Sequence, residues 1–126
     1  MLYFAYGSNM YTRDLIARIG QIETVGIDVL LGYSLRFNKI SKDGSAKANI
    51  QSFSGAVNGV LYEMTEAQFE VLDVYERGYT RIEIELASGK RAQVYISHKI
   101  DNTLMVSLAY LNKIVKGALE HGITAI

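Results

Sequence analysis

Two short stretches of the chain carry groups that could do chemistry together. The first is Tyr6-Gly7-Ser8-Asn9-Met10, which follows an apolar run and precedes a helical pattern. A strand that turns sharply into a helix leaves backbone N–H groups unpaired, and such groups suit a carboxylate or an oxyanion. The second is Glu76, a carboxylate that could take and return a proton. For the first stretch, an ordinary strand-to-helix connection with a good cap is the alternative interpretation.

The helix that leads to Glu76 has a well marked start. Thr65-Glu66-Ala67-Gln68 fits a capping box, in which the side chains of the first and last residues bond each other's backbone N–H groups. The pattern predicts a helix from Glu66 to about Tyr75 or Glu76, and Gly78 is expected to stop it.

Glu76 falls on the apolar face of this predicted helix. Phe69 and Leu72 precede it by seven and four residues, so the three side chains share one face. A carboxylate on such a face loses hydration, which raises its pKa toward neutral and suits a general base. Two alternatives stay open: a frayed helix end that leaves Glu76 in solvent, and a structural ion pair with Arg77 or Arg81.

The rest of the chain predicts short strands with helices among them. A helix is expected over residues 12–19, and Gly32 is expected to break an extended segment. Residues 51–59 are interpreted as a loop, because two small-residue turn signals fall within them. The expected strands are 2–6, 23–31, 33–37, 46–50, 60–62, 80–86 and 91–97, the last two forming a hairpin.

A long final helix completes the pattern. Asn102 or Thr103 is expected to cap it, and its apolar residues form a stripe on one face, which could cover either the sheet or a neighbouring molecule. That stripe consists of Leu104, Leu108, Leu111, Val115 and Leu119. About six or seven short strands and three flanking helices predict an α+β fold in which the sheet curls into a small mixed β-barrel with the helices outside.

Composition narrows the function classes. The chain has 126 residues, expected to form a single domain over 1–126, and no Cys, which excludes disulfides and thiolate catalysis. Its 13 basic and 13 acidic residues balance, which argues against nucleic acid or an anionic membrane as a partner. Neither a membrane-spanning run nor a signal peptide is expected, so a cytoplasmic protein is predicted. Two isolated histidines predict no metal site.

Tyr6-Gly7-Ser8-Asn9 after a short strand, together with Leu72-Asp73-Val74-Tyr75-Glu76 and the following Gly78-Tyr79, resembles the γ-glutamylcyclotransferase-like family. Three stretches between these two motifs are similar to the family as well: residues 32–37, 48–50 and 59–64. The chain departs from the family's second motif at Arg77, which separates Glu76 from Gly78. Members of this family release 5-oxoproline from a γ-glutamyl amide, with the Glu that matches Glu76 as acid and base.

The resemblance implies a set of expectations for the site. The substrate is a small γ-glutamyl compound, no cofactor or metal takes part, and Glu76 is the catalytic residue. Substrate-binding residues are expected at Tyr6, Gly7, Ser8, Asn9, Met10, Tyr79 and Tyr95. A monomer or a homodimer is expected.

Two other functions are weighed against this enzyme. The first is a non-catalytic small-molecule-binding or regulatory protein on the same scaffold. The second is a serine hydrolase with Ser8 as nucleophile, which the missing Gly-x-Ser-x-Gly elbow disfavours.

Overall fold

The computed structural model describes residues 1–124. Its elements combine one mixed sheet with three α-helices and one short 3₁₀ helix. In chain order they are β1 (Leu2–Ala5), the 3₁₀ helix η1 (Ser8–Met10), α1 (Thr12–Ile19), β2 (Glu23–Ile40), β3 (Ala46–Glu63), α2 (Glu66–Tyr75), β4 (Thr80–Glu85), β5 (Arg91–Ile96) and α3 (Leu108–Glu120). The α+β class predicted from the sequence is confirmed.

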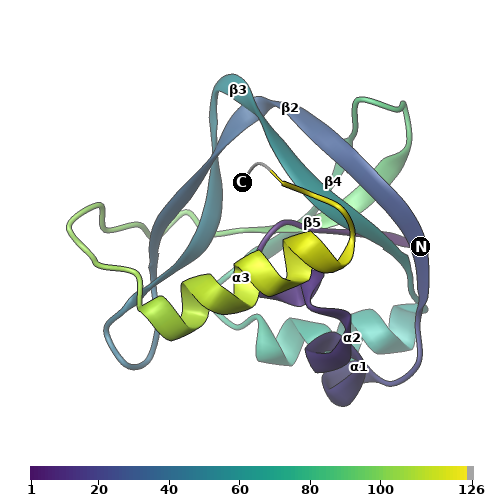
Figure 1. The fold of residues 1–126 in the computed structure, drawn as a ribbon, viewed down its shortest axis with the longest axis horizontal. Helices are drawn as coiled ribbons and strands as arrows, with labels where there is room; N and C mark the ends of the chain where they lie inside the picture. The colour runs from purple at the N-terminus through teal and green to yellow at the C-terminus, as the bar shows by residue number, and fades with distance from the viewer. Residues whose placement is uncertain (125–126) are drawn as a thin grey trace.

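The short strand β1 lies at the centre of the sheet, whose order is β2-β3-β1-β5-β4. It runs antiparallel to β3, where Tyr3 pairs with Tyr62, and parallel to β5, where Tyr3 pairs with Gln93. The sheet curls without closing, and the β2–β3 hairpin arches over the rest of the molecule (Figure 1). The carboxyl end of β1 therefore delivers the turn at residues 7–10 to the middle of the fold.

The sheet has five strands in the described chain, rather than the six or seven expected. Each long strand joins two predicted pieces, and the expected loop at residues 51–59 is part of β3. Gly32 adopts φ +82° and forms an irregularity between Leu31 and Tyr33 instead of ending the strand. The hairpin extends beyond the core, where Ile27 and Phe53 are 56% and 59% exposed, so its residues lack the alternating pattern of a half-buried strand.

The final helix begins later than the sequence predicted. Ser107 caps α3 by accepting a hydrogen bond from the Tyr110 N–H, so the expected cap at Asn102 or Thr103 is wrong. Of the two interpretations of the apolar stripe, the one in which it covers the sheet is not observed, since Leu108 and Leu119 are 72% and 60% exposed.

The face of α3 that is buried contains small residues. Ile114, Gly117 and Ala118 are buried, and a Cβ added to Gly117 would lie 2.5 Å from the Tyr11 nitrogen. Only a helix with glycine at this position can approach the N-terminal turn so closely, so a search for large apolar residues selects the wrong face of α3. Figure 1 shows α3 running across the sheet, with α1 and α2 grouped at one end of the molecule.

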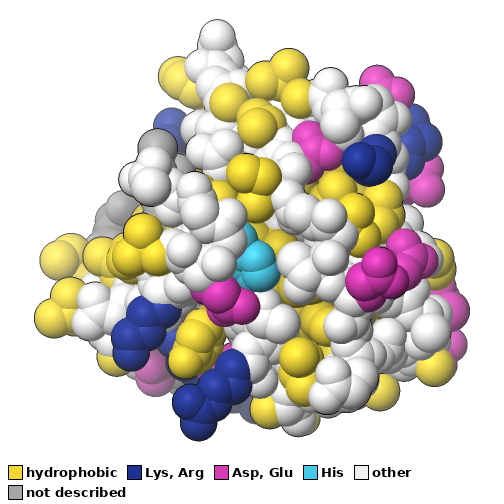
Figure 2. Space-filling model, turned by 45° about the vertical axis from the view of Figure 1, so that its right-hand side comes forward, with side chains coloured by type: hydrophobic (Ala, Val, Ile, Leu, Met, Phe, Trp, Pro, Cys, Tyr) yellow, Lys and Arg dark blue, Asp and Glu magenta, His cyan; other side chains and the backbone are white. Residues whose placement is uncertain are grey.

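The helices α1 and α2 form where the sequence predicted them. Thr65 and Gln68 make both bonds of the capping box, and Phe69 and Leu72 are fully buried. Among residues 1–124, no helix has the length and apolar character needed to cross a membrane. Hydrophobic side chains remain at the surface among the polar ones on the face drawn in Figure 2.

Candidate active site

A pocket opens where the turn after β1, the end of α2 and the backbone of β3 meet. The pocket is small, since its empty volume is about 310 Å³ even when the open solvent at its mouth is included. Its lining is Tyr3, Tyr6, Gly7, Ser8, Asn9, Ala48, Glu76, Tyr79, Tyr95 and Tyr110. We call this space the inner pocket.

Glu76 ends α2, where its N–H donates to the Leu72 carbonyl at 2.8 Å. Its Oε1 accepts a hydrogen bond of 2.7 Å from the Asn9 Nδ2, and the Asn9 Oδ1 in turn accepts one of 3.1 Å from the Arg18 Nη1. Asn9, which belongs to the first sequence motif, thus orients the carboxylate of Glu76, which belongs to the second. The other oxygen, Oε2, has no hydrogen-bond partner within residues 1–124 and is available to a ligand.

The surroundings of Glu76 favour its neutral form. Burial raises the pKa of the carboxyl group above its ordinary value, and this effect exceeds the opposing ones of the Asn9 hydrogen bond and the charges of Arg18 and Lys39. A carboxylate whose pKa is raised binds a proton more readily, which is the property a general base needs near neutral pH. Within residues 1–124, the alternative ion pair of Glu76 with Arg77 or Arg81 is not formed, and Arg81 contacts Glu66 and Asp73 instead.

The turn at residues 7–10 presents backbone donors to the inner pocket. Within residues 1–124, the N–H groups of Ser8 and Asn9 donate to no protein acceptor. The Met10 N–H is occupied, because it donates to the Gly7 carbonyl at 3.1 Å. Met10 is buried and lies outside the pocket lining, so the structure does not bring this one of the expected substrate-binding residues to the site.

Gly7 leaves space in the pocket because it has no side chain. Its φ is −118°, which requires no glycine. A Cβ at this position would lie 3.2 Å from the Ala48 Cβ and 3.5 Å from the Tyr110 hydroxyl, and would occupy the space where a ligand meets the turn.

Tyrosines form most of the pocket wall, and hydrogen bonds fix their hydroxyl groups. Tyr6 donates to the Tyr95 carbonyl at 2.6 Å, and Tyr79 to the Ala48 carbonyl at 2.7 Å. The Tyr95 hydroxyl donates to Asp73 at 2.6 Å. Burial is the main reason that the pKa of each of Tyr6, Tyr79 and Tyr95 lies above its ordinary value, so all three stay neutral.

Four residues of the site were not predicted from the sequence. Tyr3 and Tyr110 contribute rings, Ala48 contributes its backbone, and Arg18 orients Asn9. With nine tyrosines in the chain, composition alone could not select Tyr3 and Tyr110. Of these four residues, only Arg18 could have been found from the sequence. Its helix starts directly after the turn, and Arg18 lies on a different side of this helix from the exposed Arg13.

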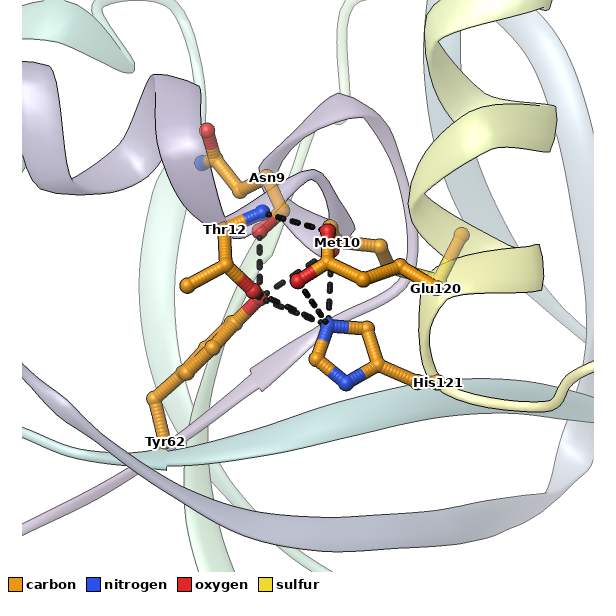
Figure 3. Close-up of polar contacts among 6 residues, drawn as sticks. All are labelled: Asn9, Met10, Thr12, Tyr62, Glu120 and His121. Carbon is orange, nitrogen blue, oxygen red and sulfur yellow. Dashed lines mark hydrogen bonds and ion pairs between the residues drawn. The ribbon is translucent and has the colours of Figure 1, made fainter.

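The rear of the turn is held by a second polar cluster (Figure 3). Tyr62 on β3 donates to the carbonyls of Asn9 and Met10 at 3.0 and 3.1 Å. Burial raises the pKa of Tyr62 to about 12, which keeps this donor protonated. The His121 Nε2 lies 3.0 Å from both the Met10 carbonyl and the Thr12 hydroxyl. We call Thr12, Tyr62, Glu120 and His121 the rear cluster.

Neither a metal site nor a serine hydrolase has support in this arrangement. No group of His, Cys, Asp and Glu suited to a metal ion occurs among residues 1–124. No histidine lines the inner pocket, so Ser8 has no imidazole base beside it. The polar groups that converge on the pocket are one carboxylate, backbone donors and tyrosine hydroxyls.

Fold and site together define a small α+β protein with one desolvated carboxylate facing a donor-rich turn. Residues 3–112 match the family model described as gamma-glutamyl cyclotransferase, AIG2-like. The chain belongs to this family, as its motifs indicated.

Solved structures are similar over nearly the whole chain. A gamma-glutamyl cyclotransferase is 27% identical, with a TM-score of 0.88 over 98% of this chain and 81% of its own. The uncharacterised human protein loc79017 is 28% identical, with a TM-score of 0.87 over 98% of this chain and 80% of its own. YkqA from Bacillus subtilis is 23% identical over 96% of this chain and 49% of its own, with a TM-score of 0.77, and shares the fold. The search of curated proteins found no match.

Proposed function

We propose that this protein is a γ-glutamyl cyclotransferase that cleaves a γ-glutamyl amide into 5-oxoproline and a free amine or amino acid. The observation that carries the proposal is the Glu76 carboxylate, which lines the inner pocket and which Asn9 orients through a hydrogen bond to one of its oxygens. Family membership and the similarity to a gamma-glutamyl cyclotransferase support it.

The proposed reaction is an intramolecular acyl transfer. The α-amine of the glutamyl group attacks its own γ-carbonyl carbon, the new C–N bond closes a lactam, and the amide C–N bond breaks. Glu76 takes a proton from the attacking nitrogen and returns it to the leaving nitrogen, so the carboxylate is regenerated. The chain's part is to fold the substrate so that amine and carbonyl meet, which replaces a large entropic barrier.

The turn at residues 7–10 supplies the complementary charge. The free N–H groups of Ser8 and Asn9 suit either the substrate α-carboxylate or the oxyanion that develops on the γ-carbonyl. The tyrosine walls exclude water from the reacting atoms, and this favours ring closure over hydrolysis. In the proposed complex the glutamyl unit binds at the inner pocket and the leaving amine extends through its mouth.

The test is release of 5-oxoproline, followed by mass spectrometry, from γ-glutamyl-alanine, γ-glutamyl-lysine, a γ-glutamyl alkylamine and glutathione. Glu76→Gln keeps the shape of the side chain and removes proton transfer, so we expect about a hundredfold to ten-thousandfold loss of turnover. Glu70→Gln is the matched control, because it makes the same chemical change at a residue on the exposed side of α2. It should retain the wild-type rate.

Two results would contradict the proposal. Wild-type turnover by Glu76→Gln would remove Glu76 from the mechanism. Absence of release from every compound, combined with binding of 5-oxoproline in calorimetry, would instead identify a binding protein on this scaffold.

A further inference from the structure

A second, wider cleft begins at the mouth of the inner pocket. The two spaces share Ser8, Glu76, Tyr79 and Tyr110, and the wider one encloses about 1140 Å³ with its open side included. We call it the outer cleft. A substrate whose glutamyl unit fills the inner pocket must place its leaving amine here, because the shared residues form the passage between the two spaces.

The lining of the outer cleft is strongly basic. Its cationic side chains are Arg18, Lys39, Lys42, Lys47, Arg77 and Lys113. Among residues 1–124, Glu76 is the only acid that lines it, although the chain as a whole has 13 basic and 13 acidic residues. Nearly half of the cations of a neutral chain therefore gather around one cleft, which attracts anions to it.

Most of these cations have no carboxylate partner. Lys113 pairs with Asp14 at 2.9 Å, and Arg18 is held by Asn9 and the ring of Tyr75. Within residues 1–124, Lys39, Lys42, Lys47 and Arg77 form no ion pair. The nearby carboxylate of Asp43 is bonded instead by the hydroxyl groups of Ser41 and Ser45.

Two of the lysines stand at the passage itself. The Lys39 Nζ lies 4.8 Å from the ring centre of Tyr79 and donates to the Arg77 carbonyl at 3.3 Å. The Lys47 Nζ lies 4.1 Å from the ring centre of Tyr110. Burial lowers the pKa of Lys39, and the charge of Lys47 lowers it further while Glu76 opposes the change. Two ammonium groups thus flank the passage, and within residues 1–124 neither forms an ion pair, so both can bind an anionic ligand.

We propose that the outer cleft binds the leaving amine of the substrate through an anionic group on that amine, a carboxylate or a phosphate, which Lys39 and Lys47 recognise. The inference rests on the proposed cyclotransferase function and adds the class of its substrate. Compounds whose leaving amine carries such a group are preferred over neutral compounds of the same shape.

Matched substrates test this preference by charge alone. γ-Glutamyl-4-aminobutyrate and γ-glutamyl-4-aminobutyramide differ only in the carboxylate on the leaving amine, and γ-glutamyl-ethanolamine phosphate and γ-glutamyl-ethanolamine differ in a phosphate. We expect kcat/KM to be about tenfold higher for the charged member of at least one pair, the size of one charge-assisted hydrogen bond. The pair that shows the larger ratio identifies the anion.

Variants connect the preference to the two lysines. Lys39→Gln and Lys47→Gln should each bring the charged-to-neutral ratio below about threefold, since each loses one recognising cation. Lys90→Gln is the control, because Lys90 is an exposed lysine on the turn between β4 and β5, outside the cleft. It should leave the ratio as in the wild type.

The outcomes separate this inference from the proposed function. Equal kcat/KM within both pairs, with 5-oxoproline released, overturns the inference and leaves the cyclotransferase in place. A preference that survives in both lysine variants also overturns it. Absence of release from all four compounds and from the uncharged γ-glutamyl alkylamine contradicts the proposed function, and the inference falls with it.

Discussion

The turn at residues 7–10 meets opposite surroundings on its two sides. On the pocket side, the N–H groups of Ser8 and Asn9 and the Oε2 of Glu76 have no partner within residues 1–124. On the other side, the carbonyls of Asn9 and Met10 accept hydrogen bonds from Tyr62, and His121 lies within hydrogen-bond distance of the Met10 carbonyl. One side is left open, and the other is saturated.

The difference explains how a short turn can hold exposed donors in place. Free N–H groups are useful to a reaction only if they keep their direction, because reorganisation would cost the stabilisation that they offer a developing charge. The rear cluster fixes the turn from behind with side chains of β3 and α3, and Gly117 lets α3 approach closely enough to do so. The turn is thus fixed by hydrogen bonds on one side, and its donors remain available to a substrate on the other side.

Among the variants that test this comparison of the two sides, the largest effect is expected from breaking the open side at Asn9. Asn9→Ala removes the bond to the Glu76 Oε1 and the partner of Arg18, so the carboxylate loses its orientation. We expect kcat/KM for a γ-glutamyl amide to fall about a hundredfold, the effect of misplacing a catalytic group by about an ångström. Steady-state kinetics measure the loss. An unchanged kcat/KM would show that the burial of Glu76, rather than Asn9, orients it.

The next effect comes from breaking the saturated side at Tyr62. Tyr62→Phe keeps the ring and leaves the buried Asn9 carbonyl without its donor, which costs about 1–3 kcal/mol of unfolding free energy. Urea denaturation measures the change, with Tyr33→Phe on the β2–β3 hairpin as a control at a tyrosine that is only partly buried. Because the turn loosens as a whole, turnover should fall as well. A stable variant with full activity would mean that the rear cluster does not support the site.

Gly117 tests whether the approach of α3 is needed. Gly117→Ala places a Cβ against the backbone of Met10 and Tyr11, and overpacking of this kind costs about 1–3 kcal/mol. We expect a lower Tm in calorimetry, even though alanine is the better helix former. The control is Lys116→Ala, one residue away on the exposed side of α3. Equal Tm values for both variants would show that α3 can shift away from the turn at no cost.

The open side could be predicted from the sequence, whereas the saturated side could not. Gly7, Ser8, Asn9 and Glu76 lie in short motifs whose local structure follows from neighbouring residues, as the capping box at Thr65 illustrates. Tyr62 and His121 reach the turn from positions 50 or more residues away, and no local pattern marks such contacts.

The same reasoning explains the errors in the fold. The β2–β3 hairpin lies partly outside the core, so no alternation of apolar residues reveals its length. The buried face of α3 includes Gly117 and Ala118 beside Ile114, and hydrophobic periodicity gives little weight to such small residues.

The smallest expected effect is a gain of stability when the charge on the open side is removed. Burial raises the folded-state pKa of Glu76 above its ordinary value of 4.5, so the folded protein favours the protonated group. Below pH 4.5 the carboxyl group of Glu76 is protonated in both the folded and the unfolded state, so it does not lower the free energy of unfolding. As the pH rises from the unfolded-state pKa of Glu76 to its folded-state pKa, the group ionises more readily in the unfolded state than in the folded state. The free energy of unfolding therefore falls.

Glu76→Gln is neutral at every pH and escapes this cost. At pH 7 we expect its Tm to exceed that of the wild type, because the wild type must keep a charged carboxylate in a buried position. The difference should shrink as the pH falls and disappear near pH 4, and scanning calorimetry over this range measures it. Glu70→Gln, whose carboxylate is exposed, should show no such trend. A Glu76→Gln variant less stable than the wild type at pH 7 would mean that Arg18 and Lys39 more than offset the burial of the carboxylate, and that the open side is built for an anion rather than for a base.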